Sequence, residues 1–359
     1  LKALEEATRV AAEVGFDACL YDENNWPSGT CDGQVTKDRP GFCSQYLACT
    51  RLFLHKGEVA ELAFESDPVA LLLSVLGEDG TRDLEQLVEV PLETPEYTVR
   101  AEQDVEVFIL EAKAGGYVDV TSEKATDRFI TLTHRKLRKA LGDKLLRKAA
   151  PLIFSDEASM LSCWDISDPM AMPWSPALAG EFKKRKGYDL LPCLPALYDN
   201  FGPRTAQIRQ DYFEVLSSLY VENFWRPQRQ WCERHGLHLT GHALAEEILH
   251  QQTLRQGNLF AVLRELHVPG VDNLRFNCDE FYHKIASSVA HQQGKSRVLS
   301  ESWGASWWDN AFNERKRNLD WQITRGINLI SPHAHYQTVF GGRKREAPPS
   351  EFKIGRAHV

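Results

Sequence analysis

One pattern recurs six times along the chain and constrains its fold more than any other feature: a short apolar segment is followed at once by polar side chains. These segments occupy residues 18–21, 152–155, 237–240, 268–272, 298–300 and 327–330. Amphipathic stretches typical of helices lie between them, and the last three steps are each about 30 residues long, the length of one βα unit. Strands that alternate with helices predict a parallel sheet with both faces covered.

Polar residues at the carboxyl end of every predicted strand favour one α/β architecture. A doubly wound sheet gathers its ligand-binding residues at one switch point. A (β/α)8 TIM-type barrel carries its chemistry on all the loops that follow its strands. We therefore expect such a barrel, incomplete, with the six predicted strands present.

The two ends of the sequence explain why fewer than eight barrel strands are expected. The sequence starts at Leu1 without Met, inside a helical pattern that covers residues 1–14. Residues 354–359 resemble the in-frame translation of a common sequencing adapter. We expect a gene fragment with a non-native tail at 354–359, with room for one further barrel strand at each end.

Residues 51–113 break the βα rhythm. Apolar and polar residues alternate there with a period of two, as in residues 104–111, and turn signals separate the alternating runs. This alternation predicts a small all-β domain inserted after the first strand. The expected domains are the first part of the barrel at 1–46, the inserted domain at 47–114, and the second part of the barrel at 115–353.

The charge balance and the missing motifs exclude several protein classes. The chain has 42 Lys and Arg residues against 50 Asp and Glu residues, a net charge of −8, so the basic face of a nucleic-acid-binding protein is not expected. No apolar run is long enough for a membrane-spanning helix. The eight cysteines form no CxxC motif, and neither a GxGxxG nor a P-loop motif occurs. We predict no organic cofactor, no nucleic-acid partner and no membrane partner.

Carboxylates recur at the predicted strand ends. The set is Asp22, Glu23, Asp156, Glu157, Asp272 and Glu301, with Glu246 and Glu247 a few residues beyond a strand. A barrel gathers these groups on one rim, where mutual repulsion raises the pKa of at least one carboxyl. A protonated acid beside an ionised carboxylate is the machinery of glycoside hydrolysis, in which one group protonates the leaving oxygen and the other activates water or attacks.

Three histidines also follow predicted strands: His242, His333 and His335. They either hydrogen-bond the hydroxyl groups of a substrate or bind a metal that activates water, as in metal-dependent barrel hydrolases. In such hydrolases the His-x-His motif stands on the first strand, but here it follows the last one. Both interpretations of the histidines stay open.

Aromatic residues beside amides point to a sugar. Trp26 lies in the loop 24–29 next to Asn25, and such a ring packs on sugar C–H groups while amides bond the hydroxyls. Trp303, with Trp307 and Trp308, follows Glu301 and is expected to line the same cleft.

In this order, the motifs resemble glycoside hydrolase family 106. Residues 20–29, Leu-Tyr-Asp-Glu-Asn-Asn-Trp-Pro-Ser-Gly, are similar to the family signature Tyr-Asp-Glu-x-x-Trp-Pro-Ser-Gly, and residues 154–157, Phe-Ser-Asp-Glu, are similar to its next block. Further matching blocks are 187–190, 194–197, 240–242, 269–272, 300–301, 332–335, 342–345 and 348–350. The resemblance spans nearly all of residues 1–350, and the ordered set is specific although each piece alone is weak.

The resemblance implies an activity and an acid–base pair. The family is known for α-L-rhamnosidases, which are inverting enzymes on a catalytic barrel with appended β-domains. By this resemblance, Glu157 is the general acid and Glu301 the general base. The family pattern has Asp followed three residues later by Glu, but that position is Ser159 in this chain. The acid assignment therefore stays open between Asp156 and Glu157.

The resemblance also implies what the site binds. The expected partner is a glycoside or oligosaccharide, an α-L-rhamnoside or a related glycan. The expected substrate-binding residues are Asp22, Glu23, Asn25, Trp26, His242, Glu247, Asp272, Trp303, His333 and His335. Some members use a calcium ion, so Ca²⁺ is the one cofactor implied. Two alternatives stay open: a metal-dependent barrel hydrolase with a His/Asp site, and a non-catalytic glycan-binding relative.

Overall fold

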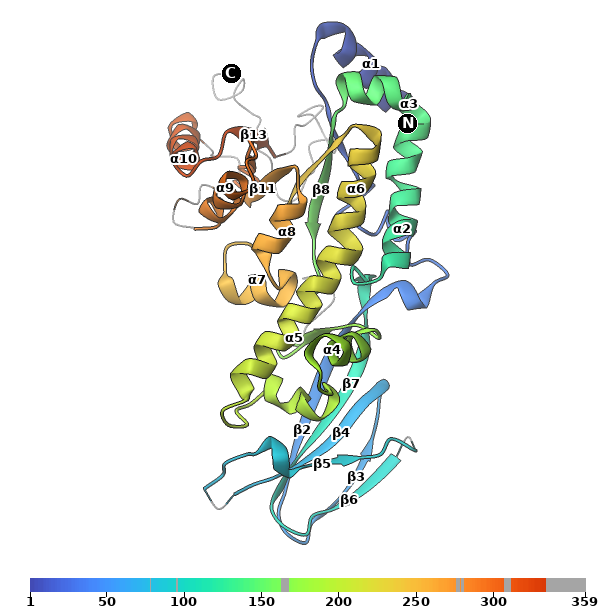
Figure 1. The fold of residues 1–359 in the computed structure, drawn as a ribbon, viewed down its shortest axis with the longest axis vertical. Coiled ribbons are helices and arrows are strands. Elements are labelled where there is room, and N and C mark those ends of the chain that lie inside the picture. Colours follow the sequence, from blue (N-terminus) through green and yellow to red (C-terminus); the bar gives the residue numbers. More distant parts are fainter. Residues whose placement is uncertain are drawn as a thin grey trace. The chain divides into compact units, whose positions relative to one another are not determined.

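The chain forms two compact units in the computed structural model (Figure 1). The parallel-sheet unit contains Leu1–Val35, Thr126–Ser159 and Val221–Val359, and the antiparallel-sheet unit contains Thr36–Ala125 and Met160–Tyr220. The structure describes residues 1–77, 79–94, 96–162, 168–275, 278, 281–306 and 311–333. His335, Trp307, Trp308 and the tail at 354–359 lie outside the described residues.

A six-stranded parallel sheet organises the first unit, and it confirms the six strand segments predicted from the sequence. The strands are β1 (Cys19–Tyr21), β8 (Leu152–Ala158), β10 (His238–Ala243), β11 (Val268–Asn273), β12 (Leu299–Ser302) and β13 (Leu329–Pro332). They stand side by side in the order of the sequence, and every neighbouring pair is parallel. The fold of this unit is therefore mixed α/β, as predicted.

Helices separate the strands and pack against them. They are α1 (Lys2–Val14), α2 (Glu123–Leu132), α3 (His134–Ala149), α6 (Arg226–His235), α7 (Leu249–Gln256), α8 (Leu259–Glu265), α9 (Tyr282–Gln292) and α10 (Phe312–Thr324). A π-helical turn at Val221–Trp225 precedes α6. α6 packs on β10, α8 on β10 and β11, and α9 on β11. No helix in the described ranges has both the length and the apolar character needed to cross a membrane.

Apolar residues in register form the core of this unit. Leu20, Ile153 and Leu239 are aligned across β1, β8 and β10, and each is at most 3% exposed. Full burial of such a side chain stabilises the fold by about 1.5–3 kcal/mol. Because this layer fixes the register of three neighbouring strands, it also fixes which polar residues face each other at their carboxyl ends.

The second unit is built on antiparallel strands. They are β2 (Cys43–Leu54), β3 (Val59–Ala63), β4 (Asp67–Val75), β5 (Leu87–Val90), β6 (Glu96–Arg100), β7 (Val105–Val118) and β9 (Met172–Trp174). Five strands form a sheet in the order β5-β4-β7-β2-β9, and β3 pairs with β6. The period-two alternation thus correctly predicted β structure. The unit is larger than the predicted insertion at 47–114, because β9 pairs with β2 and brings residues 160–220 into the same unit.

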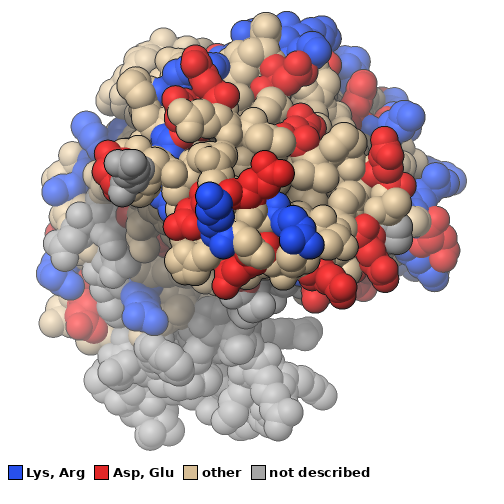
Figure 2. All heavy atoms as spheres, turned by 90° about the horizontal axis from the view of Figure 1, so that it is seen from below, with Lys and Arg blue, Asp and Glu red and all other residues tan. Residues whose placement is uncertain are grey.

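The remaining elements of this unit are helical. They are α4 (Leu178–Lys186), α5 (Thr205–Tyr220) and short 3-10 turns at Pro40–Phe42, Leu84–Gln86 and Leu191–Leu197. Leu54, Leu71, Val99 and Val107 belong to its buried apolar cluster. Positive and negative side chains are interspersed on the face of the molecule in Figure 2, so that face carries no field of a single sign.

Candidate active site

Polar residues from neighbouring strands meet at the carboxyl end of the parallel sheet. Asp156 on β8 is in register with His242 on β10, and Asp272 on β11 is in register with Glu301 on β12. These four residues come from four separate βα steps of the sequence. The sheet therefore gathers the predicted carboxylates around one histidine.

His242 lies at the centre of this cluster. Its Nε2 donates a hydrogen bond of 2.9 Å to Oε2 of Glu301 and lies 3.4 Å from Oδ1 of Asp156. The side chain is 1% exposed, with the ring of Phe154 edge-on at 5.4 Å. Burial lowers the pKa of His242, but the hydrogen bond to Glu301 and the charges of Asp156 and Asp272 outweigh it, and the pKa is raised well above its usual value. These partners therefore favour the imidazolium form of His242.

Gly241 lets the backbone of β10 reach this position. Its φ is +137°, and a Cβ atom placed there would lie 1.9 Å from the carbonyl oxygen of Ser155 on β8. Only glycine fits such an approach between two strands. This close contact between Gly241 and Ser155 fixes the position of the next residue, His242, relative to β8.

Asp156 is held by a residue that the sequence analysis did not select. The hydroxyl of Tyr21 donates a hydrogen bond of 2.6 Å to Oδ2 of Asp156, and its ring stacks on Phe154 at 6.1 Å. Burial is the main cause that raises the pKa of Asp156, and the nearby charge of Glu301 adds to it. The available signal was the position of Tyr21, at a strand end directly before Asp22.

Glu157 reaches the same cluster because β8 contains a bulge. His242 pairs with Asp156, but the next residue, Ala243, pairs with Ala158, so Glu157 is an extra residue in the ladder. Its φ of +50° lies in the left-handed region, which a residue with a Cβ adopts at a cost of about 1–2 kcal/mol. In a regular strand, Asp156 and Glu157 point to opposite faces. The bulge redirects the second carboxyl.

Glu157 and Asp272 share a hydrogen bond between their carboxyl groups. Burial, the largest cause, raises the pKa of Glu157 to about 7. Burial also raises the pKa of Asp272 well above its usual value, with the charge of Glu157 adding to the shift. A proton shared by this pair at neutral pH lowers their mutual repulsion.

Glu301 behaves in the opposite way. Burial raises its pKa, but the hydrogen bond and positive charge of His242 outweigh burial, and the pKa is lowered below its usual value. His333 adds to this effect, with its Nε2 at 3.9 Å from Oε1 of Glu301. Glu301 is thus an ionised carboxylate with a histidine at each oxygen.

Two groups of three residues have the composition of a cation site: Asp156, His242 and Glu301, and Glu157, His242 and Asp272. Within each group the candidate ligand atoms lie within 4.8 Å of one another. Oδ1 of Asp272 is buried and has no hydrogen-bond partner among the described residues. An excess of carboxylates and an unpaired buried oxygen suit a divalent cation that prefers oxygen ligands.

Asp22 contacts the cluster through the hydroxyl of Ser28. It is 1% exposed, and its Oδ1 accepts a hydrogen bond of 2.5 Å from the hydroxyl of Ser28. The same hydroxyl accepts a hydrogen bond of 2.8 Å from the backbone N–H of Asp156. Burial is the main cause that raises the pKa of Asp22. The hydroxyl of Ser28 therefore links the carboxyl of Asp22 to the backbone of Asp156.

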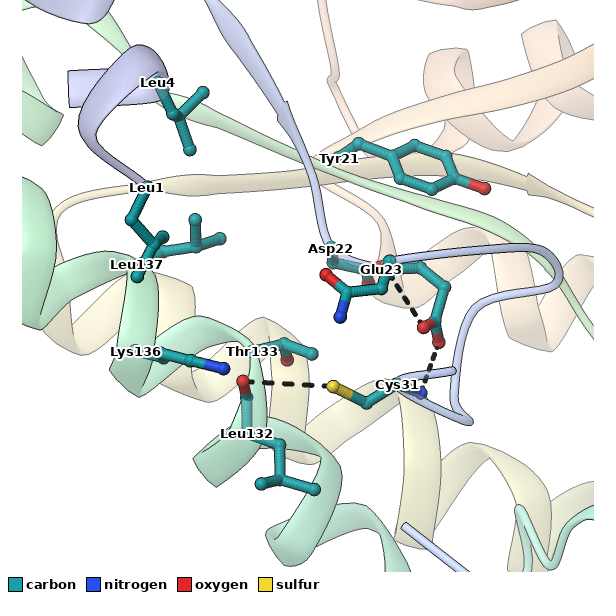
Figure 3. A pocket seen from close by; sticks show the side chains of 11 residues that line it. Leu1, Leu4, Tyr21, Asp22, Glu23, Cys31, Leu132, Thr133, Lys136 and Leu137 are labelled. Atoms are coloured by element: carbon teal, nitrogen blue, oxygen red, sulfur yellow. Dashed lines mark hydrogen bonds between the residues drawn. The ribbon is translucent and has the colours of Figure 1, made fainter. Parts of the chain in front are cut away.

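Glu23 organises the loop that follows β1. Its two carboxylate oxygens accept backbone N–H groups at 2.7–3.1 Å from Asn24, Gly29, Thr30, Cys31 and Asp32. Figure 3 shows this carboxylate turned toward Cys31 at the wall of a pocket. The loop also carries Asn25, which is exposed, and Trp26, which is half-buried.

Trp303 and the adjacent glutamates occupy different environments. Trp303 is buried, and its indole N–H donates a hydrogen bond of 3.0 Å to Asn318 on α10. Glu247 is half-buried, whereas Glu246 beside it is fully buried. Burial, the largest cause, raises the pKa of Glu246 to about 8. The sequence analysis chose Glu247 for the site, but the structure brings Glu246 to Asp272, whose backbone N–H it accepts at 3.0 Å.

Comparisons with known proteins identify a family and a similar fold. The family model for α-L-rhamnosidase, glycoside hydrolase family 106, matches residues 111–344. A solved structure, a rhamnosidase from Novosphingobium sp. PP1Y, is similar in fold with a TM-score of 0.51 and 21% sequence identity. The match covers 71% of this chain and 26% of the rhamnosidase chain, so this chain spans about a quarter of that protein. No curated protein sequence matches the chain.

Proposed function

This chain belongs to glycoside hydrolase family 106, the α-L-rhamnosidases, and on that premise we propose that it hydrolyses α-L-rhamnosides or related glycans. One observation carries the proposal: two carboxyl groups near the same imidazolium have pKa values shifted in opposite directions. The pKa of Glu157 is raised to about 7, and the pKa of Glu301 is lowered. Environments that separate two pKa values in this way assign one acid and one base.

In the proposed mechanism, Glu157 and Glu301 act on opposite sides of the glycosidic bond. Glu157 donates its proton to the glycosidic oxygen as the bond from that oxygen to the anomeric carbon breaks. Glu301 takes a proton from water, whose oxygen forms the new bond to the anomeric carbon. His242 keeps Glu301 ionised in the resting enzyme through its hydrogen bond of 2.9 Å. The anomeric configuration is inverted.

Two features favour Glu157 over Asp156 as the acid. The candidate ligand oxygens of Asp156 and Glu301 lie within 4.8 Å of each other, whereas an inverting pair needs roughly 6.5–9.5 Å to admit a water molecule. Asp156 also accepts the hydroxyl of Tyr21. We assign Asp156 the role of holding His242 and Tyr21 in place.

The substrate contacts are proposed from the residues that the sequence analysis selected. Asn25, Trp26, Asp272 and His333 are the candidates that bind sugar hydroxyls or pack on the sugar ring. Asp22, Glu23 and Trp303 already use their polar groups within the protein, so their proposed part is to shape the site. Glu247 and His335 stay proposed substrate contacts from the sequence.

A calcium ion is the proposed cofactor. Asp272 is the described residue that best fits a ligand, because its buried Oδ1 is unpaired among the described residues. A bound divalent cation supplies positive charge to an excess of carboxylates and can bind sugar hydroxyls. The residues of the acid–base pair act without it in the steps above.

For the fold, we propose that the six parallel strands belong to a (β/α)8 barrel. Their sequential order and parallel pairing support this architecture, as does the position of Asp156, His242, Asp272 and Glu301 toward the carboxyl ends of their strands.

The test is hydrolysis of an aryl α-L-rhamnoside, followed by proton NMR of the rhamnose that forms first. Inversion yields the β anomer before mutarotation, and the Glu157→Gln variant retains activity toward a leaving group that needs no protonation. Retention of configuration would instead indicate a covalent intermediate and a different pair of catalytic residues.

Two other outcomes would favour the alternative functions. Binding of rhamnosides without turnover would identify a glycan-binding relative. Cleavage of amides or esters that a chelator abolishes would favour a metal-dependent hydrolase.

A further inference from the structure

We propose that Glu246 and Gln256 form a polar clamp that holds the carboxyl ends of β8, β10 and β11 and so positions the catalytic cluster. Both residues belong to the segment that runs from the end of β10 through α7. Neither is exposed by more than 1%. The clamp gives a positioning role to residues that touch no substrate, and this role rests on the proposed function.

The clamp is needed because β10 and β11 separate at the site. Their ladder pairs only Thr240 with Val268 and Gly241 with Pro269. Beyond these pairs, β10 and β11 no longer pair with each other, although β10 still pairs with β8 and β11 with β12. A buried backbone N–H on the side of the gap therefore needs another acceptor. This divergence is what opens the sheet where His242 and Asp272 stand.

Glu246 spans the gap with its two oxygens. Oε1 accepts the backbone N–H of Ala243 at 2.9 Å, and Oε2 accepts the backbone N–H of Asp272 at 3.0 Å. Ala243 directly follows His242, so one carboxyl fixes the backbone beside the imidazolium and the backbone of Asp272. The carboxyl group of Glu246 thus supplies acceptors where β10 and β11 no longer pair with each other. Because it lies between the two strand ends, it also holds them apart.

Gln256 completes the clamp at the neighbouring strand. Its Nε2 donates to the carbonyl oxygens of Ala158 at 3.2 Å and Leu244 at 3.1 Å. Ala158 directly follows Glu157, the bulged residue of β8. Gln252, one turn earlier on α7, donates its side-chain N–H to the carbonyl oxygen of Glu246. α7 thereby ties the end of β8 to the loop that carries the clamping carboxyl.

The decisive variant is Glu246→Gln. Gln keeps one acceptor oxygen but turns an NH2 group toward the other backbone N–H, so one strand end loses its anchor with little change in volume. Misplaced catalytic groups cost up to about 100-fold in rate, and we expect kcat to fall about 10-fold to 100-fold per folded molecule. Gln256→Met removes two donated hydrogen bonds with little change in shape, and we expect a loss of about 3-fold to 10-fold.

The matched control is Glu111→Gln in the antiparallel-sheet unit. Oε1 of Glu111 accepts the backbone N–H groups of Glu65 at 2.6 Å and Ser66 at 2.8 Å, and the residue is 4% exposed. This change neutralises a buried carboxyl that accepts backbone N–H groups, as Glu246 does, but in the other unit. We expect it to leave kcat unchanged. Equal losses of kcat in the Glu111 and Glu246 variants would overturn the proposal, because the effect would then be general destabilisation.

A second readout does not depend on activity. The Nε2–H proton that His242 donates to Glu301 gives a downfield proton NMR resonance, and we expect Glu246→Gln to shift or broaden it while Glu111→Gln leaves it in place. An unchanged resonance and unchanged kcat in a folded Glu246→Gln protein would overturn the clamp. If the wild-type chain has no rhamnosidase activity but the resonance shifts, the proposed function fails and the clamp stands.

Discussion

The two units each bury carboxylates, but they compensate the charge differently. In the antiparallel-sheet unit, Glu106 lies between Arg51 at 2.6 Å and Arg82 at 2.7 Å, and Arg51 also binds Asp199 at 2.6 Å. Two guanidinium groups thus face two carboxylates. Burial raises the pKa of Asp199, but its hydrogen bonds and the arginines outweigh burial, and the pKa is lowered.

In the parallel-sheet unit, four carboxyl groups share one buried imidazolium. His242 binds Glu301 and lies beside Asp156, while Glu157 and Asp272 share their own hydrogen bond. The pKa values of three of these carboxyls are raised, chiefly by burial, and only that of Glu301 is lowered. Carboxylates matched by permanent cations stay ionised, whereas burial without a matching cation favours the protonated form of a carboxyl, which can then transfer its proton.

The largest effect is expected from removing Glu301, the ionised carboxylate of the parallel-sheet unit. We expect Glu301→Ala to lower kcat by about 10²-fold to 10⁴-fold, the range for general acid–base catalysis, because no group remains to deprotonate water. Binding of rhamnose, measured by calorimetry, should stay nearly unchanged. Full turnover by this variant would remove Glu301 from the mechanism.

The corresponding change in the antiparallel-sheet unit is Glu106→Gln, which we expect to affect stability rather than activity. It leaves two guanidinium groups without their shared carboxylate, and breaking a buried pair costs about 3–5 kcal/mol. Arg51 and Arg82 are 31% and 22% exposed, so water screens part of the interaction and we expect about 2–3 kcal/mol. Urea unfolding measures this loss, and kcat of the folded variant should equal that of the wild type. A drop in kcat without unfolding would link Glu106 to the chemistry.

The pH dependence sharpens the contrast further. The pKa of Glu157 is raised from 4.5 to about 7 in the folded state, so the folded state binds the proton more tightly than the unfolded one. This contribution to the free energy of unfolding is complete below about pH 4.5 and is lost as the pH rises to about 7. The loss is on the order of 1–3 kcal/mol.

Glu157→Gln should flatten this slope, as measured by urea unfolding at several pH values. In the wild type, kcat/KM should also fall above about pH 7, as the proposed acid loses its proton. An unchanged slope of stability in the variant would show that another group titrates.

The smallest expected effect concerns Tyr21→Phe. The change removes a hydrogen bond to the Asp156 carboxylate, but the residue is 41% exposed and water can replace the hydroxyl. We expect kcat/KM to fall about 3-fold to 10-fold, at or below the usual value of a hydrogen bond to a charged group. The Asp156→Asn variant is the comparison, and a loss larger for Tyr21→Phe than for Asp156→Asn would give Tyr21 a role of its own.

Much of the fold follows from local patterns in the sequence. The six strands were identified because each is a short apolar segment before polar residues, and the antiparallel strands because apolar and polar residues alternate. The collection of Asp156, His242, Asp272 and Glu301 at one end follows from the parallel arrangement alone. These features depend on periodicity, which a single sequence displays.

Other features depend on register and burial, which no single segment displays. The choice between Glu246 and Glu247 is set by the gap between β10 and β11. The loop contacts of Glu23 depend on how residues 29–32 fold back. Trp303 looks like a sugar platform in the sequence, but its indole N–H is bound by Asn318.

At the bulge, the regular ladder of β8 and the proposed role of Glu157 place opposing demands on the same residue. Without the extra residue, β8 and β10 would continue a regular ladder, and the left-handed backbone angle would not be needed. In the language of energy landscapes, Glu157 is a locally frustrated residue, whose own preference disagrees with the surrounding sheet. A one-residue deletion there favours a more regular sheet and removes the proposed acid, so selection for stability alone would drive the chain toward an inactive form.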